Sequence, residues 1–212
     1  MTRQPYRDFD DKIRALPMVT YENRWMRLRG SGLDLKLPSA GPISFRLRAN
    51  YSPEGYEADD SPYLQGMAER KGGFWVGGAA SWRTELGDLS AELLTDASGN
   101  SNGLQLRLGV ERAFGLGHFQ LVPLLSANWM DRKDVDYYYG VRPAEGRPDR
   151  ASYAGRSTTN WELGLRTGYA LGPQQSIFMD LSATTLGRGI TDSPLVERSS
   201  QTSIRFGYLY RF

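Results

Sequence analysis

Few side chains in this chain are suited to catalysis. Its 212 residues include no Cys and a single His, His118. A cysteine nucleophile and a thiolate zinc site are therefore excluded, and a Ser–His or His–Asp pair would depend on His118 alone. His118 follows Gly115-Leu116-Gly117, a sequence typical of a short surface turn. We therefore predict no catalytic residues, no cofactor and no enzymatic activity.

Acidic residues gather in one polar stretch. Glu57, Asp59 and Asp60 lie close together in the sequence, and Glu69 follows. Carboxylate oxygens are ligands for Ca²⁺. Solvated loop charge, or contact with the cations bound to lipopolysaccharide, explains the same cluster more simply, so we predict no resident metal.

Three consecutive tyrosines, Tyr137, Tyr138 and Tyr139, lie in a second polar stretch. Tyrosine provides a large contact area at a low entropic cost, so these residues could form an external recognition patch. A loop folded over the rest of the molecule explains them equally well. Together with Asp192, they are our candidates for external-loop contacts.

Composition limits the classes of protein to consider. With 26 basic and 24 acidic residues, the net charge of +2 gives no global attraction to nucleic acid. The mean hydropathy is −0.51. No run approaches the roughly 18 apolar residues that a membrane-spanning helix needs. We expect residues 1–212 to form a single domain.

Alternation of apolar and polar residues is the main structural signal. Backward from Phe212, every second residue is apolar or aromatic: Phe212, Tyr210, Tyr208, Phe206 and Ile204. Successive residues of a strand point to opposite faces, so one face of this segment is an aromatic strip. The same pattern predicts strands near 13–21, 43–52, 74–84, 88–97, 104–113, 118–130, 158–171, 176–187 and 201–212.

The two faces of these strands indicate an inside-out protein. A soluble sandwich would alternate too, but it would not carry continuous aromatic-ended faces opposite faces that mix Arg, Glu, Gly and Ser. A membrane barrel explains both faces, because apolar side chains meet lipid and closure pairs the backbone. Short turns alternate with the long polar stretches 53–73, 131–157 and 187–199. We predict an all-β, antiparallel transmembrane β-barrel of the bacterial outer membrane.

The number of strands depends on residues 25–37. Met26 and Leu28 lie on even positions, but Leu33, Leu35 and Leu37 lie on odd ones, with Gly30-Ser31-Gly32 between. A glycine bulge in one strand gives ten strands in all, and a tight turn between two short strands gives eleven.

Charged residues on the polar faces are predicted to line the lumen. Both signs are present, so the charges can pair across a narrow interior. The predicted lumen charges are Arg46, Arg48, Glu92, Arg107, Glu111, Glu162, Arg166, Asp180, Arg205 and Arg211.

Several segments, in order, resemble one family. They include Pro5-Tyr6-Arg7-Asp8-Phe9-Asp10, Leu16-Pro17-Met18-Val19, Asn100-Ser101-Asn102-Gly103, Tyr137-Tyr138-Tyr139-Gly140-Val141 and Thr191-Asp192-Ser193-Pro194-Leu195-Val196. With the closing aromatic strand of Phe206, Tyr208, Tyr210 and Phe212, the chain resembles the MipA/OmpV outer-membrane proteins.

This resemblance carries implications for strand number and function. A glycine-rich first strand precedes the Pro-Tyr element in the family, so this chain is expected to lack it. Adding that strand to eleven gives twelve, an even number as bacterial barrels require; ten is the alternative. The implied location is the outer membrane, in contact with lipid and lipopolysaccharide. The implied role is a scaffold for a murein transglycosylase and a penicillin-binding protein. A narrow channel for small solutes and a surface adhesin, or a protein linked to antibiotic susceptibility, are the alternatives.

Overall fold

The computed structural model describes residues 4–9 and 20–210. Within them, twelve strands belong to one sheet. The strands are β1 (Thr20–Glu22), β2 (Met26–Arg29), β3 (Gly32–Lys36), β4 (Ile43–Ser52), β5 (Gly73–Arg83), β6 (Asp88–Asp96), β7 (Leu104–Glu111), β8 (Phe114–Leu116), β9 (Phe119–Met130), β10 (Thr158–Ala170), β11 (Gln175–Thr185) and β12 (Ser200–Tyr210).

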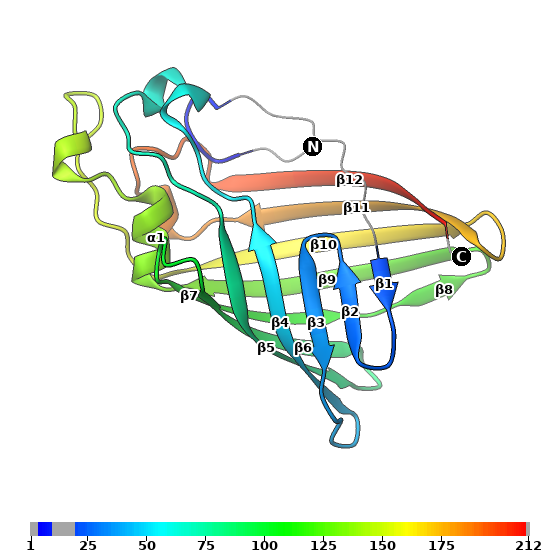
Figure 1. Cartoon of the computed structure of the whole chain (residues 1–212). Helices are drawn as coiled ribbons and strands as arrows, with labels where there is room; N and C mark the ends of the chain where they lie inside the picture. The colour runs from blue at the N-terminus through cyan, green and yellow to red at the C-terminus, as the bar shows by residue number, and fades with distance from the viewer. Residues whose placement is uncertain (1–3, 10–19, 211–212) are drawn as a thin grey trace.

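Every strand pairs antiparallel with its neighbours. The path runs from β1 to β12 in chain order, with β8 paired to β9 beside it. The sheet curls on itself, as Figure 1 shows, but no ladder between described residues of β1 and β12 closes it. The all-β antiparallel class is confirmed. The predicted strands agree to within a few residues, although positions 10–19, 211 and 212 lie outside the described residues.

The phase change near Gly30 is a turn, as strand parity predicts. Met26 pairs with Leu35 and Arg29 with Gly32, so β2 and β3 form a hairpin with a loop of Gly30 and Ser31. Gly30 has a positive φ of 57°, which two-residue hairpin turns require and glycine adopts without steric cost. The glycine-bulge alternative is wrong.

The twelfth strand is not the one expected. The sequence predicts a single strand over 104–113, but the structure ends β7 at Glu111 and begins β8 at Phe114. The register does not change, since Glu111 faces Leu124 and Phe114 faces Leu121. The break faces Pro123, which has no N–H to donate to the ladder. Proline therefore divides one long strand into two.

Long and short connections lie at opposite ends of the sheet. The long ones, 53–72, 131–157 and 186–199, gather at one end together with 97–103 and with residues 4–9, on the left of Figure 1. The short turns 84–87, 117–118 and 171–174 lie at the other end. The described long connections contain two α-helices that alternation does not reveal, α1 (Arg132–Tyr139) and α2 (Arg188–Thr191). They also contain three short 3-10 helices, Ala58–Asp60, Pro62–Leu64 and Pro143–Glu145. In the described part of the chain, no helix is long and apolar enough to cross a membrane.

Candidate functional site

The outer face of the sheet is an apolar band. Large apolar side chains from successive strands are exposed on it, including Leu47 of β4, Leu108 of β7 and Leu163 of β10, which is 64% exposed. On the C-terminal strand, Phe206, Tyr208 and Tyr210 are exposed on this band, with Phe206 74% exposed. Phe212, the fourth aromatic of the predicted signature, lies outside the described residues. A band of this kind is suited to lipid rather than water.

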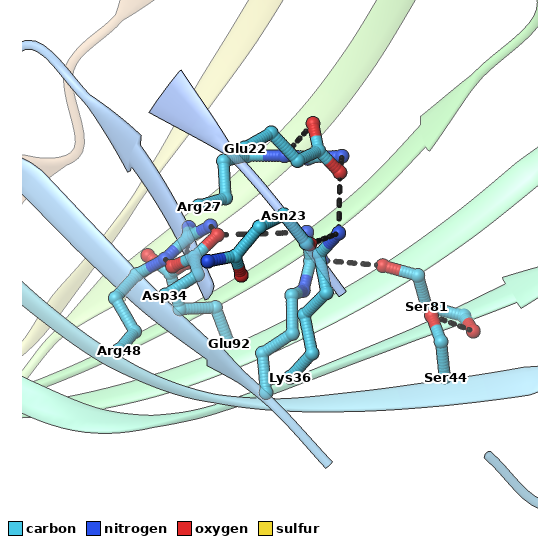
Figure 2. A network of polar contacts seen from close by, with 10 residues as sticks. Glu22, Asn23, Arg27, Asp34, Lys36, Ser44, Arg48, Ser81 and Glu92 are labelled. Atoms are coloured by element: carbon cyan, nitrogen blue, oxygen red, sulfur yellow. Dashed lines mark hydrogen bonds and ion pairs between the residues drawn. The ribbon is translucent and has the colours of Figure 1, made fainter. Parts of the chain in front are cut away.

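The inner wall, the face of the sheet opposite the apolar band, carries a network of ion pairs. Arg48 of β4 donates to Asp34 of β3 at 2.6 Å and also contacts Glu92 of β6. Arg46 lies 3.7 Å from Asp34 and donates to the Ser81 hydroxyl at 2.7 Å. Figure 2 shows how these strands bring their charged side chains together.

The same network extends to the first strand. Arg27 of β2 donates to the Glu22 carboxylate of β1 at 2.8 Å, and the Lys36 ammonium lies 2.6 Å from it (Figure 2). The side chain of Glu22 is 41% exposed, whereas that of Asp34 is 8% exposed. The exposed end of the network is therefore the weaker part, because water screens its charges.

Small residues on β5 leave room for the contact between Arg48 and Glu92. β5 lies between the strands of Arg48 and Glu92, and opposite these two residues it carries Gly77 and Ala79. A Cβ at Gly77 would come within 1.9 Å of the Leu93 carbonyl oxygen. The absence of large side chains leaves room for the guanidinium to reach across a whole strand.

A second set of wall charges lies on the last strands. Arg166, Asp180 and Arg205 share one register row across β10, β11 and β12. Arg166 donates to Asp180 at 2.9 Å, and Arg205 lies 3.9 Å from the same carboxylate. Arg29 of β2 is within electrostatic range of all three residues. Two guanidinium groups thus pair with one carboxylate, so this row of the wall carries an excess of one positive charge.

The remaining predicted wall charges have varied surroundings. Arg107 lies 3.3 Å from Glu162, across β9. Glu111 is exposed and faces Asp88 in the register. Arg211 lies outside the described residues.

The long connections form a loop cap, which we define as residues 4–9, 53–72, 97–103, 131–157 and 186–199. Its interior resembles the core of a soluble protein. Seven buried apolar or aromatic side chains meet there, from four separate parts of the cap: Tyr6, Tyr56, Tyr63, Leu64, Met67, Val141 and Leu195. The cap therefore has its own hydrophobic core, stabilised by burial.

Buried arginines cross-link the cap. Arg70 donates to both oxygens of the Glu145 carboxylate, at 3.0–3.1 Å, and to the Tyr137 carbonyl at 2.6 Å. Arg150, with 0% exposure, donates to the carbonyls of Tyr63, Gln65 and Glu145. Burial tends to raise the pKa of Glu145, but the N–H groups of Arg142 and Ala68 and the charge of Arg70 lower it overall. The pair is therefore ionised and saturated with hydrogen bonds.

Asp134 joins the cap to the sheet. It lies in the first turn of α1, has 0% exposure, and accepts a hydrogen bond from Gln105 of β7 at 2.8 Å. Its second carboxylate oxygen is buried and has no hydrogen-bond partner in the described structure. Burial raises the pKa of Asp134 to about 7, with further contributions from the acidic residues Glu54, Asp131 and Asp96.

The candidate external contacts differ in their exposure. Tyr138 is buried at 3% exposure, and Tyr139 packs against the cap core. Tyr137 is half-buried, and its hydroxyl accepts the Lys71 N–H at 2.8 Å. Asp192 lies on the surface, where it pairs with Arg156. External contact by these residues stays a prediction.

His118 and the acidic stretch are not assembled into a reactive site. His118 is exposed in the two-residue turn between β8 and β9. Asp60 accepts the Glu57 N–H at 2.9 Å, and Glu69 lies 3.7 Å from Lys71. Among residues 4–9 and 20–210, no group of three acidic, His or Cys side chains is placed to hold a metal ion.

Comparison with known families gives a match over the whole chain. The model of the MltA-interacting protein MipA family matches residues 1–212. The chain belongs to the MipA family. The apolar band and the interior charges of this MipA-family chain are thus those of an outer-membrane protein, which confirms the predicted location.

Individual relatives of the MipA-family chain are distant but extend over most of its length. The putative outer membrane protein YiaT of Escherichia coli K12 is 26% identical over 98% of this chain and 86% of its own length. The MltA-interacting protein of the same strain is 27% identical over 100% of this chain and 87% of its own length. In structure, the chain is similar to the outer membrane channel DcaP of Acinetobacter baumannii, with 11% identity, a TM-score of 0.41, and coverage of 87% of this chain and 52% of that one. The names of the relatives describe outer-membrane or interacting proteins and no enzyme.

Several important residues of this MipA-family chain were missed by sequence reasoning. Asp34 and Lys36 alternate with Leu33 and Leu35, so alternation alone could have placed them on the inner wall. Arg70, Glu145, Arg150 and Asp134 lie in long polar connections without periodicity. No local signal distinguishes their burial from ordinary loop charge.

Proposed function

We propose that this chain is a non-enzymatic interaction protein of the outer membrane that brings a murein transglycosylase and a penicillin-binding protein together. The observation that carries the proposal is its similarity, over its whole length, to a relative named for its interaction with MltA. The structure favours an interaction protein rather than an open pore, because the loop cap has a packed core and most wall charges are paired.

Partners from the murein side would meet the short-turn end. The long connections mark the extracellular end of a barrel, so the short turns face the periplasm. Apolar side chains are exposed there: Leu86 is 81% exposed, Leu116 is 60% exposed and Leu171 is 54% exposed. Exposed leucines at the turn tips would give a partner apolar anchors in a polar rim.

Site-specific crosslinking in intact cells tests this proposal. A photo-crosslinking amino acid is placed at Leu86 in the short-turn end, and at Lys71 in the loop cap as the matched control. We expect mass spectrometry to identify a lytic transglycosylase and a penicillin-binding protein from position 86 and not from position 71. Recovery of neither enzyme from position 86, or of both equally from the two positions, would contradict the scaffold.

A narrow anion path is a second candidate function. It is favoured by the two guanidinium groups of Arg166 and Arg205, which share the single carboxylate of Asp180 on the inner wall. In planar bilayers, Arg205→Glu should then shift the reversal potential toward cation selectivity. Arg156→Glu, on the outer surface of the cap, should leave it unchanged. A protein that forms no conducting channels would eliminate this candidate.

A further inference from the structure

A groove of about 440 Å³ crosses the loop cap between α1 and the segment 140–154. Its volume lies within the range of about 300–1,000 Å³ typical of small-molecule sites. The polar side chains that line it come from two parts of the cap, residues 97–103 and 131–157: Ser101, Lys133, Asp136, Tyr137, Arg142, Ser152 and Tyr153. Gly140, Val141, Pro143 and Ala154 complete the lining, so the groove has both polar and apolar walls.

The walls of this groove are held by backbone contacts. Val141 and Tyr153 form an antiparallel bridge with hydrogen bonds of 2.8 and 2.9 Å. Gly155 packs so closely on α1 that a Cβ there would come within 2.4 Å of the Asp136 N. The Gly155 N–H donates to the Asp136 carboxylate at 2.7 Å. These contacts fix the distance between the helix and the facing strand segment.

The buried Arg70–Glu145 pair of the cap is hydrogen-bonded to two residues of the groove. Arg70 binds the carbonyl of Tyr137, and Glu145 accepts the N–H of Arg142, at 2.6 and 2.9 Å. Two of the groove residues are thus anchored to one buried pair. A preformed site loses less conformational entropy when it binds a ligand.

The chemistry of the lining points to one class of ligand. Lys133 and Arg142 supply two cations and Asp136 supplies one carboxylate, so the charged side chains of the lining carry a net charge of +1. Tyr137 and Tyr153 supply aromatic rings that can pack on a sugar ring, whereas the Ser101 hydroxyl is already bonded to Asp96 and to the Gly103 N–H. A guanidinium or ammonium group binds phosphate and carboxylate oxygens through charge-assisted hydrogen bonds.

We propose that this groove binds an anionic saccharide, a sugar ring that carries a phosphate or carboxylate group, at the extracellular end of the barrel. This site is independent of the proposed interaction with murein enzymes, which involves the opposite end. Two sources present the chemistry: the phosphorylated core of lipopolysaccharide in the same leaflet, and a free sugar phosphate.

Calorimetric titration of the full-length chain in detergent tests this proposal. The probes are glucose 6-phosphate and the core oligosaccharide released from lipopolysaccharide, the latter with and without phosphatase treatment. Glucose alone is the uncharged comparison. We expect saturable binding of at least one phosphorylated probe, and at least tenfold weaker binding after the phosphate is removed. Binding of the core alone identifies lipopolysaccharide as the source, and binding of glucose 6-phosphate alone identifies a free ligand.

Surface substitutions locate the binding to the groove. Lys133→Gln and Arg142→Gln should each weaken binding about tenfold, the loss of one hydrogen bond to a charged group. Arg132→Gln is the matched control, because Arg132 is exposed on the same helix but does not line the groove. The affinity of the Arg132→Gln variant for the phosphorylated probe should stay within twofold of the wild-type value. Heat-modifiable migration on gels confirms that each variant is folded. Failure of every phosphorylated probe to saturate, or an equal loss with Arg132→Gln, would overturn the site.

Discussion

The barrel wall and the loop cap place their apolar side chains in opposite ways within one chain. In the wall, leucines and aromatic side chains face outward and the charges face inward. In the cap, apolar side chains such as Leu64 and Leu195 are buried, and most surface residues are polar. The difference shows that the surroundings decide what the interior must be: lipid around the wall favours apolar side chains outside, and water around the cap favours them inside.

Buried charge also differs between the two regions. The wall pairs its charges in an interior where side chains keep partial exposure, such as 28% for Arg48. The cap encloses Arg70, Glu145 and Arg150 almost completely. An enclosed ion pair is costly to break, because the remaining charge cannot be solvated.

The largest effect is expected from breaking the cap pair. Glu145→Ala should lower the free energy of opening of residues 141–153 by about 3–5 kcal/mol, since Arg70 is left buried without its carboxylate. Hydrogen exchange of the 141–153 amides measures it. Glu69→Ala removes an exposed pair in the same cap and should cost less than about 1 kcal/mol. Equal effects of the two variants would show that the cap does not enclose its charges.

A charge placed on the apolar band should produce the next largest effect. Leu163→Arg is expected to destabilise the barrel by about 2–4 kcal/mol, because Leu163 lies in the middle of β10 and faces lipid. Ala151→Arg, at an exposed position of the cap, should stay within about 0.5 kcal/mol. Urea unfolding from lipid vesicles, followed by tryptophan fluorescence, compares them. If the two substitutions cost the same, the outer face does not meet lipid.

The pH dependence of the cap tests its attachment through Asp134. The pKa of Asp134 is about 7 in the folded protein against an ordinary value of 3.8, so the folded state binds the extra proton between these values. Its stabilising contribution is complete below pH 4 and is lost as the pH rises through 7. Hydrogen exchange of α1 should show a loss of about 2 kcal/mol between pH 5 and pH 7.

Asp134→Asn supplies the control for this pH effect. The amide cannot ionise, so the loss between pH 5 and pH 7 should disappear while the bond to Gln105 can persist. A wild-type cap that is equally protected at both pH values would contradict the raised pKa.

The smallest effect is expected at the exposed end of the inner wall. Glu22→Gln should cost at most about 1 kcal/mol, because the carboxylate is 41% exposed even though Arg27 and Lys36 both contact it. Asp34→Asn, at the buried centre of the same network, should cost more. Urea unfolding of both variants measures the gradient along the wall, and a larger cost for Glu22→Gln would reverse it.

The wall could be predicted from the sequence to a much greater extent than the cap. Strand periodicity is a local signal, and the turn at Gly30 and Ser31 follows from the phase of the leucines on either side. The division between β7 and β8 depends on Pro123 of the neighbouring strand, so the residues of β7 carry no sign of it.

The structure of the cap could not be predicted from the sequence, because it depends on contacts between segments that are far apart in the chain. Arg70 and Glu145 are 75 residues apart, and neither lies in a periodic element. The helix α1 is short and polar, with Asp131 as its N-cap, so no apolar stripe marks it. Asp34 is an intermediate case, because alternation predicts its face, and its partners Arg46 and Arg48 lie on the neighbouring strand β4.

The contact between Arg48 and Glu92 has a consequence for how the strands find their partners. The two residues lie on strands that do not hydrogen-bond to each other, and their contact passes over Gly77 and Ala79 of β5. A slip of β5 by one residue would turn its other face inward and bring Val76 or Gly78 under the guanidinium. If the slip brings Val76 inward, its isopropyl group occupies the space in which Arg48 and Glu92 meet. The pair therefore disfavours the slip that brings Val76 inward, whereas the opposite slip keeps a glycine and an alanine, Gly78 and Ala80, beneath it.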